Sequence, residues 1–189
     1  MNREQVLKKL AHHEPFPLPG GSAQRASVLV PLRPGPNGAD DIEVVLTRRV
    51  EHPADPHSGQ VSFPGGREEA GDMNREATAL REAEEELRIP ADRVRIVGHL
   101  DEMLTITGYH VVPVIGWIAR EIELVPNPDE VARVFTVSLA ELLLEERWER
   151  RIHAWRGNEV LVWHFPHDGE DVWGATAFML RGMVELLRD

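Results

Sequence analysis

The sequence contains no cysteine, fewer basic than acidic residues and no long uninterrupted apolar segment. The absence of cysteine excludes disulfide bonds, thiolate metal sites and a cysteine nucleophile. With 21 Lys and Arg against 32 Asp and Glu, the formal net charge is −11. This charge argues against general binding to nucleic acids or to membrane surfaces, because both are polyanions. A small anionic substrate is still compatible with it if divalent metal ions reverse the local field.

The N-terminal segment MNREQVLKKLAHHEPF carries charges throughout and lacks an apolar core of signal-peptide length. No later segment reaches the apolar length of a membrane span. The sequence therefore predicts a soluble, cytoplasmic protein. Its 189 residues, 42% of them hydrophobic, suit the size and apolar content of one domain, which we expect to span residues 1–189.

Short apolar and β-branched runs, bounded by turn-forming residues, predict several strands. They cover residues 26–32, 42–47, 95–100, 109–118, 131–137 and 160–165. The first two are expected to form a hairpin across the segment PGPNGAD, and an irregular loop at 48–58 follows them. Because Pro113 interrupts the strand at 109–118, we expect that strand to be bulged or near an edge of the sheet.

Helical periodicity is clearest at 74–87, which contains neither proline nor glycine, and at 176–187 near the C-terminus. A short N-terminal helical extension is expected within about 1–14, ahead of Pro15. Ser138 followed by Glu141 predicts a capping box for a helix over the segment SLAELLLEE. Two substantial helices covering a mixed sheet define the expected fold class, α/β (α+β).

The helix at 74–87 places Glu82, Glu85 and Glu86 on one face within about one turn, whereas Glu84 points elsewhere. Like charges at this spacing destabilise a bare helix, so a compensating cation is expected. Arg81, four residues before Glu85, supplies part of the compensation. A hard cation such as Mg²⁺ or Mn²⁺, which prefers oxygen ligands, would supply more. The alternative interpretation is a solvated charged face.

A double glycine, Gly65 and Gly66, follows the β-like run QVSF just before this helix. Glycines at such a position let the backbone pass close to a bound ion or phosphate and expose a carbonyl oxygen. Taken alone, the segment PGG predicts only a turn. Joined to the acidic helix, it predicts a site for a divalent metal and the polyphosphate that the metal carries.

The double glycine and the helix together resemble the box of the Nudix hydrolases, G-x5-E-x7-R-E-U-x-E-E-x-G-U with U aliphatic. The matching residues are Gly66, Asp72 in place of the first acid, Arg81, Glu82, Ala83, Glu85, Glu86 and Ile89. Two departures stand out. Eight residues rather than seven separate Asp72 from Arg81, which leaves the role of Asp72 open, and Arg88 occupies the position of the late glycine.

The segment LTRRVEHPADPHSGQVSFPGG resembles the motif that precedes the box in the coenzyme A pyrophosphatase branch of this family. TGYHVVPVIG and NPDEVARVF resemble later segments of the same branch, so the similarity extends from about Leu46 to Phe135. The resemblance implies a Nudix-type α/β/α sandwich, with the box at about 66–89. It also implies an Mg²⁺- or Mn²⁺-dependent hydrolase that splits coenzyme A into 4′-phosphopantetheine and adenosine 3′,5′-bisphosphate. Alternatives are a Nudix hydrolase of ADP-ribose, dinucleotides or nucleoside triphosphates, or a binding module without catalysis.

The resemblance also assigns site residues. Glu82, Glu86 and Glu85 are expected to bind the metal, and Gly65, Gly66 and Arg49 to contact the substrate. Arg81, Glu85 and Glu130 form the expected catalytic group, with Glu130 or Glu85 as the general base. Arg48 is a second arginine that could clamp a phosphate. His110 and His57 could titrate near neutrality, although histidines at such positions are more often structural.

Overall fold

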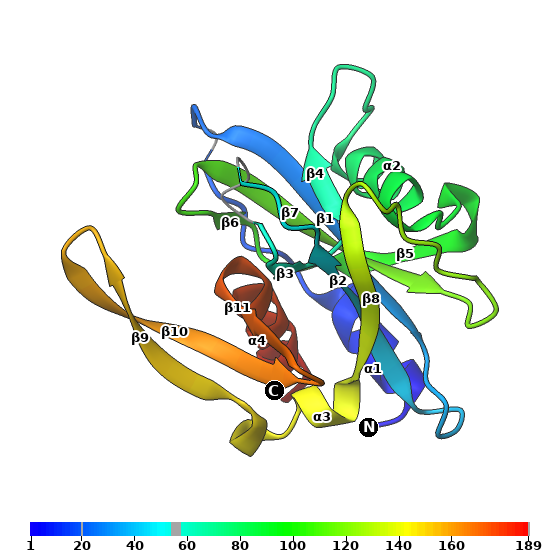
Figure 1. Cartoon of the computed structure of the whole chain (residues 1–189). Helices are drawn as coiled ribbons and strands as arrows, with labels where there is room; N and C mark the ends of the chain where they lie inside the picture. Colours follow the sequence, from blue (N-terminus) through cyan, green and yellow to red (C-terminus); the bar gives the residue numbers. More distant parts are fainter. Residues whose placement is uncertain (20, 54–57, 189) are drawn as a thin grey trace.

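The computed structural model describes residues 1–19, 21–53 and 58–188 and contains two β-sheets and four α-helices (Figure 1). The larger sheet has eight strands, with the order β3-β2-β1-β7-β5, while β4 pairs with β1, β6 with β7 and β8 with β2. Its strands are β1 (Gln24–Pro34), β2 (Ile42–Arg49), β3 (Val61–Ser62), β4 (Gly65–Arg67), β5 (Val94–His99), β6 (Met103–Leu104), β7 (Tyr109–Ile118) and β8 (Val131–Ser138). The smaller sheet has the order β11-β10-β9 and consists of β9 (Glu149–Trp155), β10 (Asn158–His167) and β11 (Glu170–Trp173).

Helices cover both faces of the larger sheet, which is mixed because β1 runs parallel to β7 and antiparallel to β2. The helix α2 (Arg75–Leu87) packs on one face through a core that includes Ala79, Ala83 and Leu87. The helices α1 (Arg3–His12) and α4 (Gly174–Arg188) pack on the other face through a second, larger core. The expected mixed sheet with helices is thus confirmed, as are the predicted N-terminal helix, the first hairpin and the acidic helix.

The strand that contains Pro113 is not at an edge, because β7 lies between β1 and β5. The expected irregularity occurs in the neighbouring strand β5, whose register with β7 shifts between Ile96 and Gly98. Pro113 itself lies where the pairing of β7 passes from β5 to β6, and its carbonyl accepts from the amide of Leu100 at 3.0 Å. The missing N–H of proline therefore falls beside a gap between two short partner strands.

The helix predicted over the segment SLAELLLEE is wrong in length and in capping. Only α3 (Leu139–Leu142) is α-helical, a 3₁₀ turn follows at Glu145–Arg147, and the hydroxyl of Ser138 makes no capping bond. The carboxylate of Glu141 is instead bound by Arg147 at 2.5 Å and by His167 at 3.2 Å. Arg147 and His167 therefore bind the carboxylate that Glu141 would need for a capping box.

The smaller sheet was only partly predicted, since β10 was expected at 160–165 and neither β9 nor β11 was expected. Two tight turns connect its strands, one through Arg156 and Gly157 and one through Asp168 and Gly169. All four of these residues have positive φ, at 47°, 80°, 48° and 79°. No helix in the described ranges is long and apolar enough to cross a membrane.

Candidate active site

The acidic helix α2 begins and ends with well-defined caps. The side chain of Asn74 accepts a hydrogen bond from the amide of Ala77 at 2.8 Å and so satisfies the first turn. At the other end Arg88, which stands where the Nudix pattern has glycine, adopts a left-handed conformation with φ of 54°. Its amide and that of Ile89 donate to carbonyls of the last turn, Arg88 to Glu84 and Ile89 to Ala83. The helix therefore ends at the position that the pattern predicts, with a non-glycine residue in a glycine conformation.

Glu86 is the most deeply buried carboxylate of the helix, with only 2% of its surface exposed. Its Oε1 accepts one hydrogen bond, from the amide of Gly65 at 3.3 Å. The pKa of Glu86 is raised to about 8, chiefly by burial and also by the charges of Glu130 and Glu82, against the opposing effects of Gly65 and Arg49. A carboxylate at this position is costly to ionise unless a cation lies beside it.

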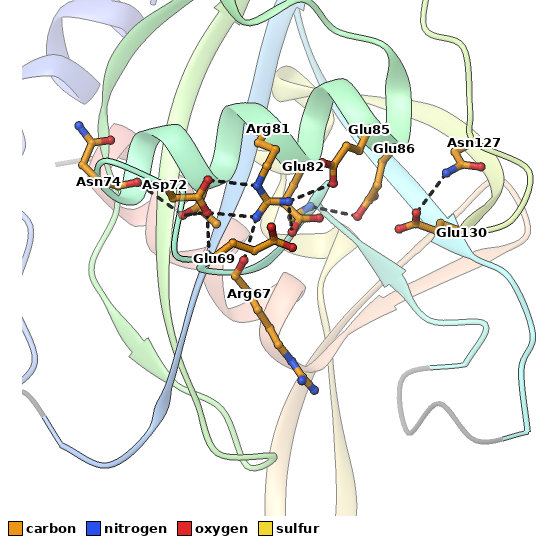
Figure 2. Close-up of polar contacts among 12 residues, drawn as sticks. Arg67, Glu69, Asp72, Asn74, Arg81, Glu82, Glu85, Glu86, Asn127 and Glu130 are labelled. Atoms are coloured by element: carbon orange, nitrogen blue, oxygen red, sulfur yellow. Dashed lines mark hydrogen bonds and ion pairs between the residues drawn. The ribbon is translucent and has the colours of Figure 1, made fainter.

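Glu82 and Glu85 share a single counter-charge, the guanidinium of Arg81. Its Nη1 donates to Glu82 at 2.9 Å and to Glu85 at 3.0 Å (Figure 2). Burial still raises the pKa of Glu82, although Arg81 opposes the effect. About half of the Glu85 side chain is exposed, so Glu86 lies inside and Glu85 at the surface, and the convergence of the three carboxylates on one metal stays a prediction.

Asp72 holds Arg81 from the other side (Figure 2). Nε of Arg81 donates to Oδ1 of Asp72 and Nη2 donates to Oδ2, both at 3.1 Å. The amide of Glu69 and the hydroxyl of Thr78 also donate to Oδ2, each at 2.9 Å. The hydrogen bonds from Arg81, with smaller contributions from Glu69 and Thr78, lower the pKa of Asp72 to about 2. The additional residue between Asp72 and Arg81 thus does not prevent their contact. Asp72 orients the arginine that binds Glu82 and Glu85.

The double glycine lies on β4, directly against the acidic face of α2. A Cβ atom on Gly66 would lie 2.3 Å from Oε1 of Glu82, and one on Gly65 would lie 2.5 Å from the carbonyl oxygen of Ser27. The backbone neighbour of Gly65 cannot move away, so that position requires glycine, whereas a side chain at Gly66 would displace the carboxylate of Glu82. The neighbouring carbonyl of Arg67 accepts from Nη2 of Arg81 at 2.9 Å, which fixes β4 to the same arginine.

Glu130 comes from the loop before β8 and faces the end of α2 (Figure 2). Its charge acts on both Glu86 and Glu82. The side-chain amide of Asn127 donates to Glu130 at 3.1 Å, and the backbone amide of Asn127 donates to the carbonyl of Glu86 at 2.8 Å. Asn127 therefore joins the loop to the helix. Asn127 was not predicted from the sequence, although its position three residues before Glu130 in the turn NPDE is a signal that could have indicated it.

Arg49 lies at the end of β2, where its charge lowers the pKa of Glu86. The loop that leaves β2 is closed at its base, because the amide of Arg49 donates to the carbonyl of Gln60 at 3.0 Å. The next amide, that of Val50, donates to the carbonyl of Glu130 at 3.0 Å. Arg48 instead binds Glu51 at 2.9 Å. Of the two arginines considered for phosphate binding, Arg49 is thus the one whose charge reaches the carboxylates.

The two histidines proposed as titrating groups have different outcomes. His110 is buried and its Nε2 lies 2.6 Å from a carboxylate oxygen of Glu102, which also accepts from the amide of Leu18. This contact gives His110 a structural partner outside the acidic cluster. His57 lies outside the residues that the structure describes.

The donor set suits a hard divalent cation, although the side chains do not yet form a complete cage. Within residues 1–19, 21–53 and 58–188, no three Asp, Glu or His side chains are close enough together to hold a metal ion. The carboxylates of Glu82, Glu85, Glu86 and Glu130 nevertheless supply only oxygen ligands, as Mg²⁺ and Mn²⁺ prefer. In the part of the chain that the structure describes, the buried carboxylate of Glu86 accepts a weak hydrogen bond from Gly65 at 3.3 Å, and a cation would satisfy it further. The residues present therefore fit the expected metal.

The comparisons with known proteins agree with this arrangement. The NUDIX domain model matches residues 23–157. The chain is 37% identical over 164 residues to the uncharacterized Nudix hydrolase NudL of Yersinia pestis (strain Pestoides F), covering 86% of this chain and 79% of the relative. The chain belongs to the Nudix family.

Solved structures of the family share the fold. The Ap4A hydrolase of C. elegans in a binary complex superposes with a TM-score of 0.51 at 19% identity, covering 64% of this chain and 83% of that one. The Nudix hydrolase RenU of M. smegmatis superposes with a TM-score of 0.52 at 25% identity, covering 63% and 73% of the two chains. The α+β fold with its mixed sheet is therefore that of Nudix hydrolases, a family of enzymes that act on small molecules with divalent metal ions.

Proposed function

We propose that residues 1–189 form one cytoplasmic Nudix domain that hydrolyses the diphosphate of coenzyme A or its derivatives with Mg²⁺ or Mn²⁺. The observation that carries the proposal is the buried carboxylate of Glu86, placed between Glu82 and Glu130 and next to the backbone of Gly65. A bound divalent ion would neutralise diphosphate oxygens and lower the pKa of an attacking water. Glu82 and Glu86, with Glu85 at the surface, would hold it.

The chain's own groups have separate tasks in this proposal. Arg81 holds Glu82 and Glu85 in place and is itself held by Asp72, so it would position the metal ligands. Gly65 and Gly66 let the diphosphate approach the backbone of β4. Arg49, whose charge reaches Glu86, would bind a phosphate oxygen of the substrate.

Glu130 is our candidate for the general base that removes the proton from the attacking water. Among the described residues Asn127 binds one oxygen of Glu130, and the other would accept from the water, whereas Glu85 is bound by Arg81 and lies further toward solvent. A base must reach its proton within hydrogen-bond distance, and Glu130 faces the inner carboxylates. A smaller rate loss in Glu130→Gln than in Glu85→Gln at saturating metal would assign the base to Glu85.

The substrate is proposed from the segment between β2 and α2, whose sequence resembles the coenzyme A pyrophosphatase branch. Arg49, where this segment begins, and Gly65 within it both act on Glu86, so a substrate bound beside Glu86 would lie near them. ADP-ribose, dinucleotides and nucleoside triphosphates are the competing substrates. A Nudix domain without catalysis is the third possibility.

The decisive experiment identifies by mass the products formed from coenzyme A with and without Mg²⁺ or Mn²⁺. We expect 4′-phosphopantetheine and adenosine 3′,5′-bisphosphate, formed only with metal, and a higher kcat/KM for coenzyme A than for the competing substrates. Equal or faster turnover of ADP-ribose, a dinucleotide or a nucleoside triphosphate would overturn the substrate assignment and keep the enzyme class.

A matched pair of variants tests the metal site. Glu86→Gln should lower kcat by more than about 100-fold while the fold is retained, because it removes a buried ligand without changing the side-chain shape. Glu84→Gln makes the same chemical change two residues away on the exposed side of the helix, and it should keep wild-type activity. An unchanged rate in Glu86→Gln would remove Glu86 from the site.

A further inference from the structure

The strands β9 and β10 extend away from the rest of the molecule as a two-stranded ribbon (Figure 1). They pair from Glu149 with His164 at the base to Trp155 with Asn158 at the tip. The third strand, β11, pairs only with residues 164–167 of β10. We call residues 149–163 the arm. A ribbon of two strands is marginally stable by itself and usually needs another layer against one of its faces.

One face of the arm continues the hydrophobic core beyond the edge of the body. Phe165 is fully buried and Trp163, two residues nearer the tip, is partly buried. Leu161, two residues further, is 64% exposed, and so is its cross-strand partner Ile152. Alternate residues of a strand share one face, so a single apolar stripe runs from the core into solvent with nothing covering its outer part in the described chain.

The opposite face of the arm is covered differently. It carries His153, and His164 continues this face just beyond the arm; the rings of both stack with that of Trp173 at centroid distances of 5.2 Å and 5.9 Å. Arg151 on this face binds Asp171 at 2.7 Å. Contacts with β11 therefore occupy the base of this face. Trp155 and Val160 nearer the tip are 37% and 38% exposed, against 64% for both Ile152 and Leu161, so the more exposed apolar side chains belong to the face of Ile152 and Leu161.

The two ends of the apolar face are complementary to each other. At the base, Arg150 pairs with Trp163, and its guanidinium lies 4.3 Å from the centroid of the Trp163 ring. At the tip, Ala154 pairs with Glu159. The base thus carries a positive charge and a large ring, whereas the tip carries a negative charge and a small side chain.

We propose that this face is a homodimer interface, in which the arms of two copies pack face to face and antiparallel. Ile152 and Leu161 would then bury one another at the centre. A two-fold axis across the arms places β9 of one copy over β9 of the other, so Arg150 at the base of each arm would lie over Ala154 at the tip of the second copy. Arg150 would then be next to Glu159, which pairs with Ala154 on the adjacent strand, and this contact occurs twice. The proposal is independent of the proposed catalytic function.

The first test measures the oligomeric state by sedimentation velocity over a range of micromolar concentrations. The wild-type chain should be a dimer, and Ile152→Ser combined with Leu161→Ser should raise the dissociation constant by about 100-fold or more. Ile106→Ser is the matched control, since Ile106 is 67% exposed in the loop before β7 and far from the arm in sequence. A monomeric wild-type chain, or a dimer that survives the double substitution, would overturn the proposal.

The second test uses reversed charges and distinguishes contacts between copies from contacts within one arm. Arg150→Glu and Glu159→Arg should each weaken the homodimer, because each places like charges across the interface. An equimolar mixture of the two single variants should form a heterodimer, in which every reversed residue meets an opposite charge. Charges that interact only within one arm would gain nothing from mixing, and a mixture no more dimeric than its components would refute the arrangement.

Discussion

Replacing Asp72 by asparagine keeps the shape of the side chain and removes the negative charge that binds Arg81 at two distances of 3.1 Å. Only 6% of the Asp72 side chain is exposed, so solvent compensates little for the loss. The pKa of Asp72 falls from 3.8 to about 2, chiefly through its hydrogen bonds with Arg81. At about 1.4 kcal/mol for each pKa unit, and allowing for screening, the interaction contributes about 1 to 2 kcal/mol at neutral pH.

The sign of the pH dependence follows from the lowered pKa. The carboxylate stabilises the folded protein fully above the unfolded pKa of 3.8. This stabilisation is lost as the pH falls toward about 2, where the folded protein also binds the proton. The side-chain amide introduced by Asp72→Asn cannot titrate, so the difference in unfolding free energy between wild type and this variant should be constant above about pH 5. The difference should disappear between about pH 4 and about pH 2.

Thermal unfolding at a series of pH values measures this difference, with an expected loss in Tm of roughly 3 to 6 °C at pH 7. Asp92→Asn, at an exposed acid in the turn after α2, is the control and should match wild type at each pH. Isothermal titration with Mn²⁺ should show metal affinity about 10 to 100-fold weaker in Asp72→Asn, since Arg81 would no longer be held in place. A gap in Tm that persists at pH 2, or no gap at pH 7, would refute the assigned role of Asp72.

Two further substitutions test the local geometry of the site and of its helix. Gly66→Ala places a Cβ atom 2.3 Å from Glu82, so it should displace that carboxylate and reduce metal-dependent turnover at least about 10-fold. Gly71→Ala is the control: no atom lies within 4 Å of the added Cβ, so this variant should keep the wild-type turnover. Arg88→Gly relieves a left-handed conformation with φ of 54° and should raise the unfolding free energy by about 0.5 to 1 kcal/mol. Urea denaturation measures this gain, and a loss of stability would show that the Arg88 side chain contributes more than its backbone costs.

Helical periodicity and the three carboxylates were predictable because both depend on residues three and four apart in the sequence. Glu82, Glu85 and Glu86 must share a face if 74–87 is helical, whatever the rest of the chain does. Their different burial was not predictable in this way. It depends on β4 and on the loop of Glu130, which approach the helix only in the folded chain.

The smaller sheet shows what was overlooked and why. Asp168 and Gly169 form a two-residue turn with positive φ at both positions. In a sequence, an Asp-Gly pair between two apolar runs is the strongest short-range signal for a hairpin. The strand β11 was therefore predictable from this turn, although it was not predicted. The strand β9 is harder to predict, because Glu149, Arg150 and Arg151 interrupt the apolar alternation that indicates a strand. Its strand conformation depends on pairing with β10.

The distribution of charge in the site is the physical reason for proposing that it binds a divalent metal ion. Asp72 and Arg81 neutralise each other, and the remaining donors of Arg81 reach Glu82 and Glu85 but not the inner carboxylate of Glu86. Burial and the neighbouring acids raise the pKa of Glu86 to about 8, so folding alone leaves an acid there that is costly to ionise. A divalent ion bound beside it would reverse that cost and turn an acidic cluster into a site for an anionic diphosphate. The burial of Glu86 among other acids makes its ionisation costly without a metal. The same burial would therefore favour a substrate that binds together with a divalent ion.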